Sequence, residues 1–165
     1  MVKRRRGYTL VELLVVSAIL AVVISMGSTL FVRINTFTRI SVGKIETQRD
    51  VRNLMTLITR EMRRALASKI TLTRADATQP PYSKITFQNY LGETVSIWQS
   101  GRTLILQKNG TSTLLSKNLR SLLFYFPSSD DMSLVSILLT MEKSDGTGRT
   151  QSLQLGGETV RILNE

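Results

Sequence analysis

The segment RRRGYTLVELLVVSAILAVV, residues 4–23, contains a single glutamate, Glu12, inside an otherwise apolar run. Glu12 is the only charged residue between Tyr8 and Val32. A carboxylate placed in hydrocarbon costs about 2.5–3.5 kcal/mol on membrane-insertion scales, and such residues usually have a function. The sequence therefore raises the question of which group this carboxylate meets.

The run from Leu10 to Val32 is long enough to cross a bilayer as a helix. Its 23 residues would span roughly 35 Å at 1.5 Å per residue, against a hydrocarbon core of about 30 Å. Positive charge on the preceding flank predicts an amino terminus held on the cytoplasmic side and a carboxy-terminal domain outside. The basic residues of that flank are Lys3, Arg4, Arg5 and Arg6.

This stretch has three possible interpretations as an amino-terminal segment. A secretory signal would be cleaved at a small-residue site, which Ala18 to Ala21 imitates, but the apolar run continues well beyond Ala21. An uncleaved signal anchor explains the length and the basic flank but gives Glu12 no role. The third interpretation rests on the residues around Glu12.

The stretch GYTLVELLVV, residues 7–16, resembles the prepilin-type signal of type IV pilins and pseudopilins. Those proteins have a short basic leader ending in glycine, then an aromatic residue, then glutamate at the fifth mature position. Gly7, Tyr8 and Glu12 are in this register, although the family's usual aromatic is phenylalanine. The resemblance implies that residues 1–7 are a leader, which a membrane-embedded aspartic prepilin peptidase removes between Gly7 and Tyr8. It further implies that the new Tyr8 amine is methylated and that Glu12 pairs with the amine of an adjacent subunit.

The composition excludes several classes of enzyme. The chain has 165 residues with no cysteine and no histidine, which rules out a Ser-His-Asp triad, a Cys-His pair and thiolate or histidine metal sites. Its 22 basic and 12 acidic residues give a net charge of +10. We expect no enzymatic activity, no cofactor and no dedicated metal site, and we interpret Asp130, Asp131 and Asp145 as turn formers rather than calcium ligands.

Residues 33–72 are predicted to form an amphipathic helix that packs on a sheet. Its apolar residues recur at intervals of three and four: Val51, Leu54, Met55, Ile58, Met62, Ala65, Leu66 and Ile70. The same segment carries arginines that suggest an alternative, contact with DNA in a competence pilus: Arg49, Arg52, Arg60, Arg63 and Arg64. No aromatic residues are interleaved with them for base stacking, which disfavours the nucleic-acid alternative.

Residues 73–83, which contain Pro80 and Pro81, are predicted to be a linker, and residues 84–165 an antiparallel sheet. Strands are predicted at 84–91, 93–100, 103–109, 112–116, 121–126 and 132–143, with a hairpin turn at Asn109-Gly110. Two further short runs flank Gly156-Gly157, which we interpret as a turn. The predicted fold is α+β, with a long helix, membrane-spanning over residues 8–32 and amphipathic beyond, packed on the sheet.

These features predict a minor structural subunit of a type IV pilus-like filament or a type II secretion pseudopilus. The arrangement of the arginine-rich helix, the linker, the Trp98 strand and the late strand SLLFYF (121–126) resembles that of minor pseudopilins of the J type and minor pilins of the W type. The resemblance implies as partners other pilin or pseudopilin subunits, the prepilin peptidase, an inner-membrane assembly platform and, before assembly, membrane lipid. It places the protein in the bacterial cytoplasmic membrane with a single pass, and then in the filament. The alternative is a membrane-anchored extracytoplasmic binding module that never polymerises.

Overall fold

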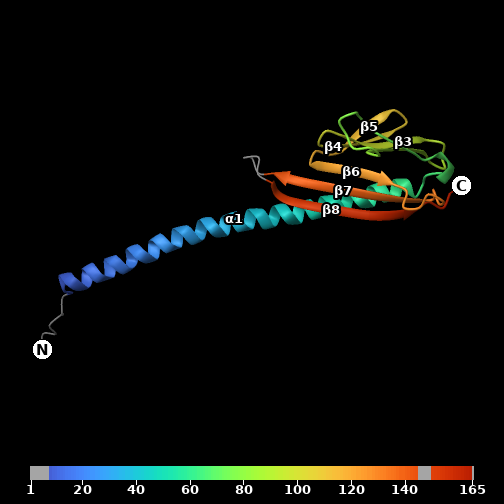
Figure 1. Ribbon diagram of the computed structural model, residues 1–165. Coiled ribbons are helices and arrows are strands. Elements are labelled where there is room, and N and C mark those ends of the chain that lie inside the picture. The colour runs from blue at the N-terminus through green and yellow to red at the C-terminus, as the bar shows by residue number, and fades with distance from the viewer. Residues whose placement is uncertain (1–7, 145–149, 165) are drawn as a thin grey trace. The chain divides into compact units, whose positions relative to one another are not determined.

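The computed structural model describes residues 8–144 and 150–164. Within these ranges the chain forms one α-helix, α1 (Leu10–Met62), one short 3-10 helix, η1 (Ala67–Lys69), and eight strands (Figure 1). The chain divides into two units, Met1–Ser41 and Val42–Glu165, and α1 contributes residues to both. The α+β class predicted from the sequence is confirmed.

The strands form two antiparallel sheets in the second unit. One sheet has the order β1-β2-β3-β4-β5 and the other has the order β6-β7-β8. The bounds of the strands are β1 (Thr71–Thr73), β2 (Lys84–Gln88), β3 (Thr94–Ser100), β4 (Thr103–Lys108), β5 (Thr111–Ser116), β6 (Leu119–Tyr125), β7 (Leu134–Ser144) and β8 (Thr150–Arg161). The predicted turn at Asn109-Gly110 joins β4 to β5, with positive φ at both residues, as a tight hairpin of this kind requires.

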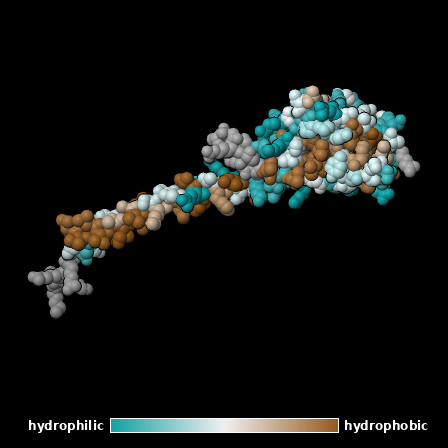
Figure 2. Space-filling view, in the orientation of Figure 1, coloured by the Kyte–Doolittle hydropathy of each residue, from teal (hydrophilic) through white to brown (hydrophobic). Residues whose placement is uncertain are grey.

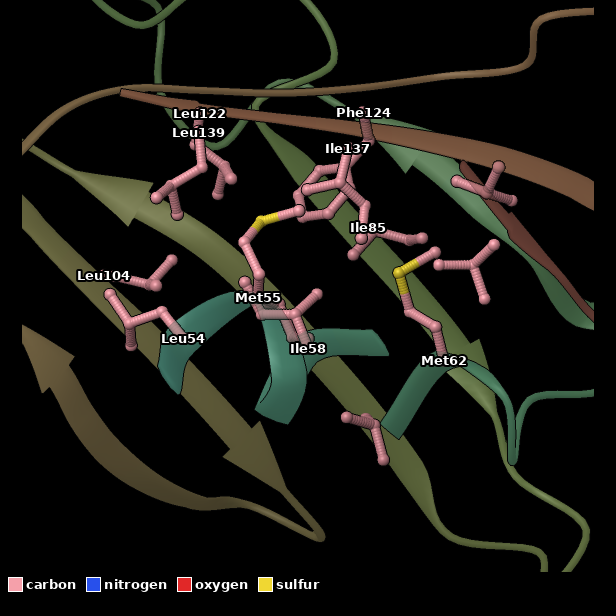
Figure 3. Packing of buried hydrophobic residues seen from close by; sticks show 14 of the residues in the cluster. Leu54, Met55, Ile58, Met62, Ile85, Leu104, Leu122, Phe124, Ile137 and Leu139 are labelled. Carbon is pink, nitrogen blue, oxygen red and sulfur yellow. The ribbon is translucent and has the colours of Figure 1, made fainter. Parts of the chain in front are cut away.

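The apolar stripe of α1 packs against both sheets, as the periodicity predicts. Ile58 and Met62 are completely buried, and Val51, Leu54 and Met55 are buried beside them. Figure 3 shows Leu54, Met55, Ile58 and Met62 among residues of both sheets, namely Ile85, Leu104, Leu122, Phe124, Ile137 and Leu139. Because each fully buried aliphatic or aromatic side chain contributes about 1.5–3 kcal/mol relative to exposure, this layer is the main source of the unit's stability.

A buried glutamine, Gln99 on β3, links the two sheets. Its Nε2 donates to the Arg120 carbonyl at 3.1 Å and to the Gly101 carbonyl at 2.8 Å. Its Oε1 accepts a hydrogen bond from the Leu122 amide at 2.9 Å. A buried amide is costly unless it is hydrogen-bonded, so this satisfied side chain fixes β6 beside β3.

The helix ends at Met62 rather than at residue 72, so this part of the sequence prediction was wrong. The peptide groups beyond Met62 bond to other segments: the Leu66 amide donates to the Gln88 carbonyl, and the Arg64 carbonyl accepts from the Tyr90 amide. The Asn164 side chain donates to the Arg63 carbonyl at 3.1 Å. Ala65 remains buried although it is outside the helix, which is why the apolar periodicity continued past the true end.

Gly156 and Gly157 lie inside the single strand β8, so the predicted turn between two short strands was also wrong. They pair with Leu139 and Leu138 of β7 in an uninterrupted register. Neither glycine has a positive φ. A Cβ on Gly156 would lie 2.7 Å from Cγ1 of Val51, so the reason for this glycine is the close approach of α1 to β8.

We predict that Gly156→Ala destabilises the protein, by about 1–3 kcal/mol, because its methyl group overpacks the helix contact. Val51 cannot turn away easily, since a valine in a helix has one strongly preferred rotamer. Gly157→Ala is the matched control, because its Cβ would meet Leu138 Cδ1 at an ordinary 3.5 Å. Thermal unfolding of the full chain in detergent measures both variants, and equal melting temperatures would show that the contact does not constrain residue 156.

Candidate functional site

The amino-terminal part of α1 is an apolar surface. Every residue from Tyr8 to Val32 is exposed, and Figure 2 shows apolar side chains along this part of the helix. By length and composition α1 is able to cross a membrane. Whether this surface can lie in lipid or pack against other helices therefore depends on how its polar groups are hydrogen-bonded.

The hydroxyl groups of the apolar stretch are satisfied within the helix. Ser17 donates to the Leu14 carbonyl at 2.9 Å, and Ser25 donates to the Val22 carbonyl at 2.8 Å. Ser28 and Thr29 both donate to the Ser25 carbonyl. Hydrocarbon offers no hydrogen bonds, so these internal bonds let the helix carry hydroxyl groups there. Glu12 remains as the one charged group of the stretch.

Glu12 closes a reciprocal cap at the start of α1. Its Oε2 accepts from the Thr9 amide at 2.9 Å and from the Thr9 hydroxyl at 3.2 Å. In return the Glu12 amide donates to Thr9 Oγ1 at 3.2 Å. The Thr9 carbonyl accepts the first intrahelical bond, from the Leu13 amide. Thr9 is thus the N-cap and Glu12 the third helical residue of a capping box, where a carboxylate is also favoured by the helix dipole.

Thr9 is a site residue that our reading of the sequence missed. The signal was present, because Ser or Thr followed three residues later by Glu, just before an apolar run, is typical of a capping box. The cap uses only Oε2 of Glu12; Oε1 accepts no hydrogen bond from any residue between Tyr8 and Asn164 that the structure describes. The cap therefore leaves one carboxylate oxygen open to a further donor.

The other residues predicted for processing lie mostly outside the described residues. Lys3, Arg4, Arg5, Arg6 and Gly7 belong to this group. Asp145, which was considered as a calcium ligand, also lies outside the described residues. Tyr8 is described, and its side chain is 89% exposed, one position before the N-cap. The side chains of Tyr8 and Glu12 therefore occupy the entry to the helix, where both are accessible to another molecule.

Asp131, one of the aspartates considered as calcium ligands, acts as a turn former in the structure. Asp131 Oδ1 accepts from the Ser133 amide at 2.9 Å and from the Ser133 hydroxyl. These bonds favour the ionised carboxylate and hold the pKa of Asp131 below its usual value. The described part of the chain contains no group of three or more potential His, Cys, Asp or Glu ligands.

We predict that Thr9→Ala frays the first turn of α1, because loss of an N-cap side chain costs about 0.5–2 kcal/mol. Amide hydrogen exchange at Leu10 to Leu13, measured on the full chain in detergent micelles, should accelerate. Thr38→Ala is the control, because the Thr38 hydroxyl only bonds back to the Ile34 carbonyl within the helix. Exchange at the first turn that matches the wild type would contradict the capping role.

Comparison with known proteins gives a match in the amino-terminal segment that contains Gly7, Tyr8 and Glu12. Residues 2–28 match the prokaryotic N-terminal methylation motif. No curated protein and no solved structure matches the chain at a significant level. The match covers the basic flank, the Gly7-Tyr8 bond, the capping box and the first part of the apolar helix. This chain carries the prepilin-type signal of type IV pilins and pseudopilins.

Proposed function

We propose that the protein is a minor structural subunit of a type IV pilus-like filament or a type II secretion pseudopilus. The observation that carries the proposal is the methylation motif at residues 2–28, with Glu12 in the first turn of an exposed apolar helix. The motif is that of structural subunits rather than of enzymes. As the subclass we propose a J-type or W-type subunit, because the order of arginine-rich helix, linker and strands in the sequence resembles those proteins.

In this proposal the helix changes its surroundings. Residues 8–32 first lie in the cytoplasmic membrane, with residues 33–165 on its outer side and the leader charges on the cytoplasmic side. The prepilin peptidase cuts between Gly7 and Tyr8, the Tyr8 amine is methylated, and an assembly platform moves the subunit into the filament. Glycine leaves the scissile backbone uncrowded and accessible to the peptidase.

Glu12 supplies the physical reason for assembly in one register. It is four residues, or about 6 Å, beyond Tyr8, which is shallow enough for contact with headgroups while the subunit is in the membrane. Among packed helices the water is lost, and a carboxylate without a charged partner becomes expensive. Cleavage creates a cationic amine on Tyr8, and the amine of an adjacent subunit can bond to the Glu12 oxygen that the cap leaves open. A neighbour slipped by one turn would leave both charges unmatched.

The rival proposal is an anchored binding module that never polymerises. Deleting the prepilin peptidase separates the two, because only a filament subunit should change in mass. We expect the protein in such membranes to be heavier by the leader, residues 1–7. An unchanged mass would favour the anchored module.

We predict that Gly7→Val leaves a membrane-bound precursor that still carries its leader, because the branched side chain crowds the scissile bond. Mass spectrometry of the membrane fraction measures this directly. Gly27→Val is a matched control, because a Cβ there would meet nothing within 4 Å. Normal mature protein from the Gly7 variant would refute processing at this bond.

We predict that Glu12→Leu is inserted and processed normally yet is depleted from filaments, although the variant helix is more apolar. The readout is the ratio of the protein in sheared filaments to the protein in membranes. Val11→Leu controls for a change of side chain at a neighbouring position that carries no charge. Normal incorporation of Glu12→Leu would refute the proposal that Glu12 pairs with the Tyr8 amine of an adjacent subunit.

A further inference from the structure

Four arginines line one side of the carboxy-terminal part of α1 and the turn that follows it. Arg49, Arg52, Arg60 and Arg63 are all exposed. At 3.6 residues per turn they lie within an arc of about 80°, opposite the helix face that is buried against the sheets. Thr56, also exposed, occupies the middle of the arc. We call these four residues the arginine stripe.

The arginine stripe has no carboxylate partner among the residues that the structure describes. The ion pairs found there join Arg64 to Glu61, Lys108 to Glu93, Arg120 to Glu142, and Lys143 to Glu46. Like charges three residues apart, as in Arg49 with Arg52 and Arg60 with Arg63, destabilise a helix rather than support it. The stripe therefore contributes nothing evident to the fold, and its charge is available to a partner.

Carboxylates flank the arginine stripe on both sides. Glu158 of β8 accepts from the Thr59 hydroxyl at 3.1 Å. It lines an open hollow of about 380 Å³ with Arg52 and another of about 500 Å³ with Arg60 and Arg63. On the other flank, Asp50 lines a hollow of about 470 Å³ together with residues of β5. The stripe thus has one carboxylate on each flank, Glu158 and Asp50. A further basic residue lines a hollow beside each of them, Arg64 beside Glu158 and Lys117 beside Asp50.

This pattern distinguishes a protein partner from a nucleic acid. A phosphate backbone presents negative charge across a wide surface and would be repelled by the flanking carboxylates. The stripe also has no aromatic side chain on which a base could stack. A row of separate carboxylates fits better, because each guanidinium can bind one of them through two hydrogen bonds.

We infer that the arginine stripe docks an acidic face of a different protein subunit in the same assembly. This inference rests on the proposed function. The arginines form two pairs whose centres are about 16 Å apart along the helix, so the partner should present two groups of carboxylates at that separation. The α1 helix of a second copy fits poorly. Beyond Arg33 it carries three acidic residues: Glu46 is paired with Lys143, Glu61 is buried, and Asp50 is the third.

The first test replaces all four arginines by glutamine in the full chain and measures incorporation into filaments. We expect a loss of about tenfold or more, because truncating the charged partner of an interface pair is costly. The control replaces four other exposed basic residues by glutamine, Lys44, Lys69, Arg74 and Arg161, which removes the same total charge. The control should be incorporated normally, and all forms should have the same melting temperature.

The second test identifies the chemistry of the partner. Replacing the four arginines by lysine keeps the charge and supplies amines that a carbodiimide can couple to carboxylates in contact. We expect new cross-links from positions 49, 52, 60 or 63 to aspartate or glutamate of another subunit in the filament. Cross-links only within the chain, or to a second copy of it, would overturn the inference.

Two further outcomes have distinct meanings. Normal incorporation of the glutamine variant, with wild type present in filaments, overturns the inference and leaves the proposed function intact. A gel-shift assay with full-length protein in detergent tests binding to a random-sequence DNA duplex. If the wild type retards the duplex and the normally incorporated glutamine variant does not, the stripe is a nucleic-acid surface instead. Absence of the wild-type chain from filaments refutes the proposed function, and the docking inference with it.

Discussion

The bond between the Glu12 carboxylate and the Thr9 amide is the interaction on which the account of this protein depends. It gives the only charge of the apolar stretch a partner before any other subunit is present. The cap stabilises the start of α1 and keeps the charge at the end of the helix, where the dipole favours it. One oxygen remains for a second partner. A single side chain thereby serves helix stability in the free subunit and, in the proposed function, register in the filament.

The segments and faces of α1 differ in what they contact. Residues 10–32 carry apolar side chains around the whole helix, with Glu12 as their one charged residue, which suits lipid or a bundle of helices. From Val51 to Met62 one face is buried, and Gly156 lets it lie close to β8. The opposite face carries the arginine stripe, which the fold does not use. Packing thus fixes the orientation of the helix, and that orientation decides which charges remain available for a partner.

The sequence predicted the features that follow from periodicity and composition. The spacing of Leu54, Met55 and Ile58 showed which helix face is buried, and Asn109-Gly110 marked a hairpin. The errors arose where distant residues decide the local structure. The helix stops at Met62 because β2, the following turn and Asn164 take the next peptide groups, and β8 continues through Gly156 because α1 needs the space. Thr9 was different, since its capping pattern is local and was available in the sequence.

The most direct test separates the two roles of Glu12. Glu12→Gln keeps an oxygen for Thr9, because glutamine also completes a capping box, but it removes the negative charge. The measurement is the fraction of this variant in sheared filaments, with first-turn amide exchange as a check that the cap is intact. The account predicts wild-type exchange together with strong depletion from filaments. A variant that is capped and incorporated like wild type would contradict it, because the charge of Glu12 would then have no role in assembly.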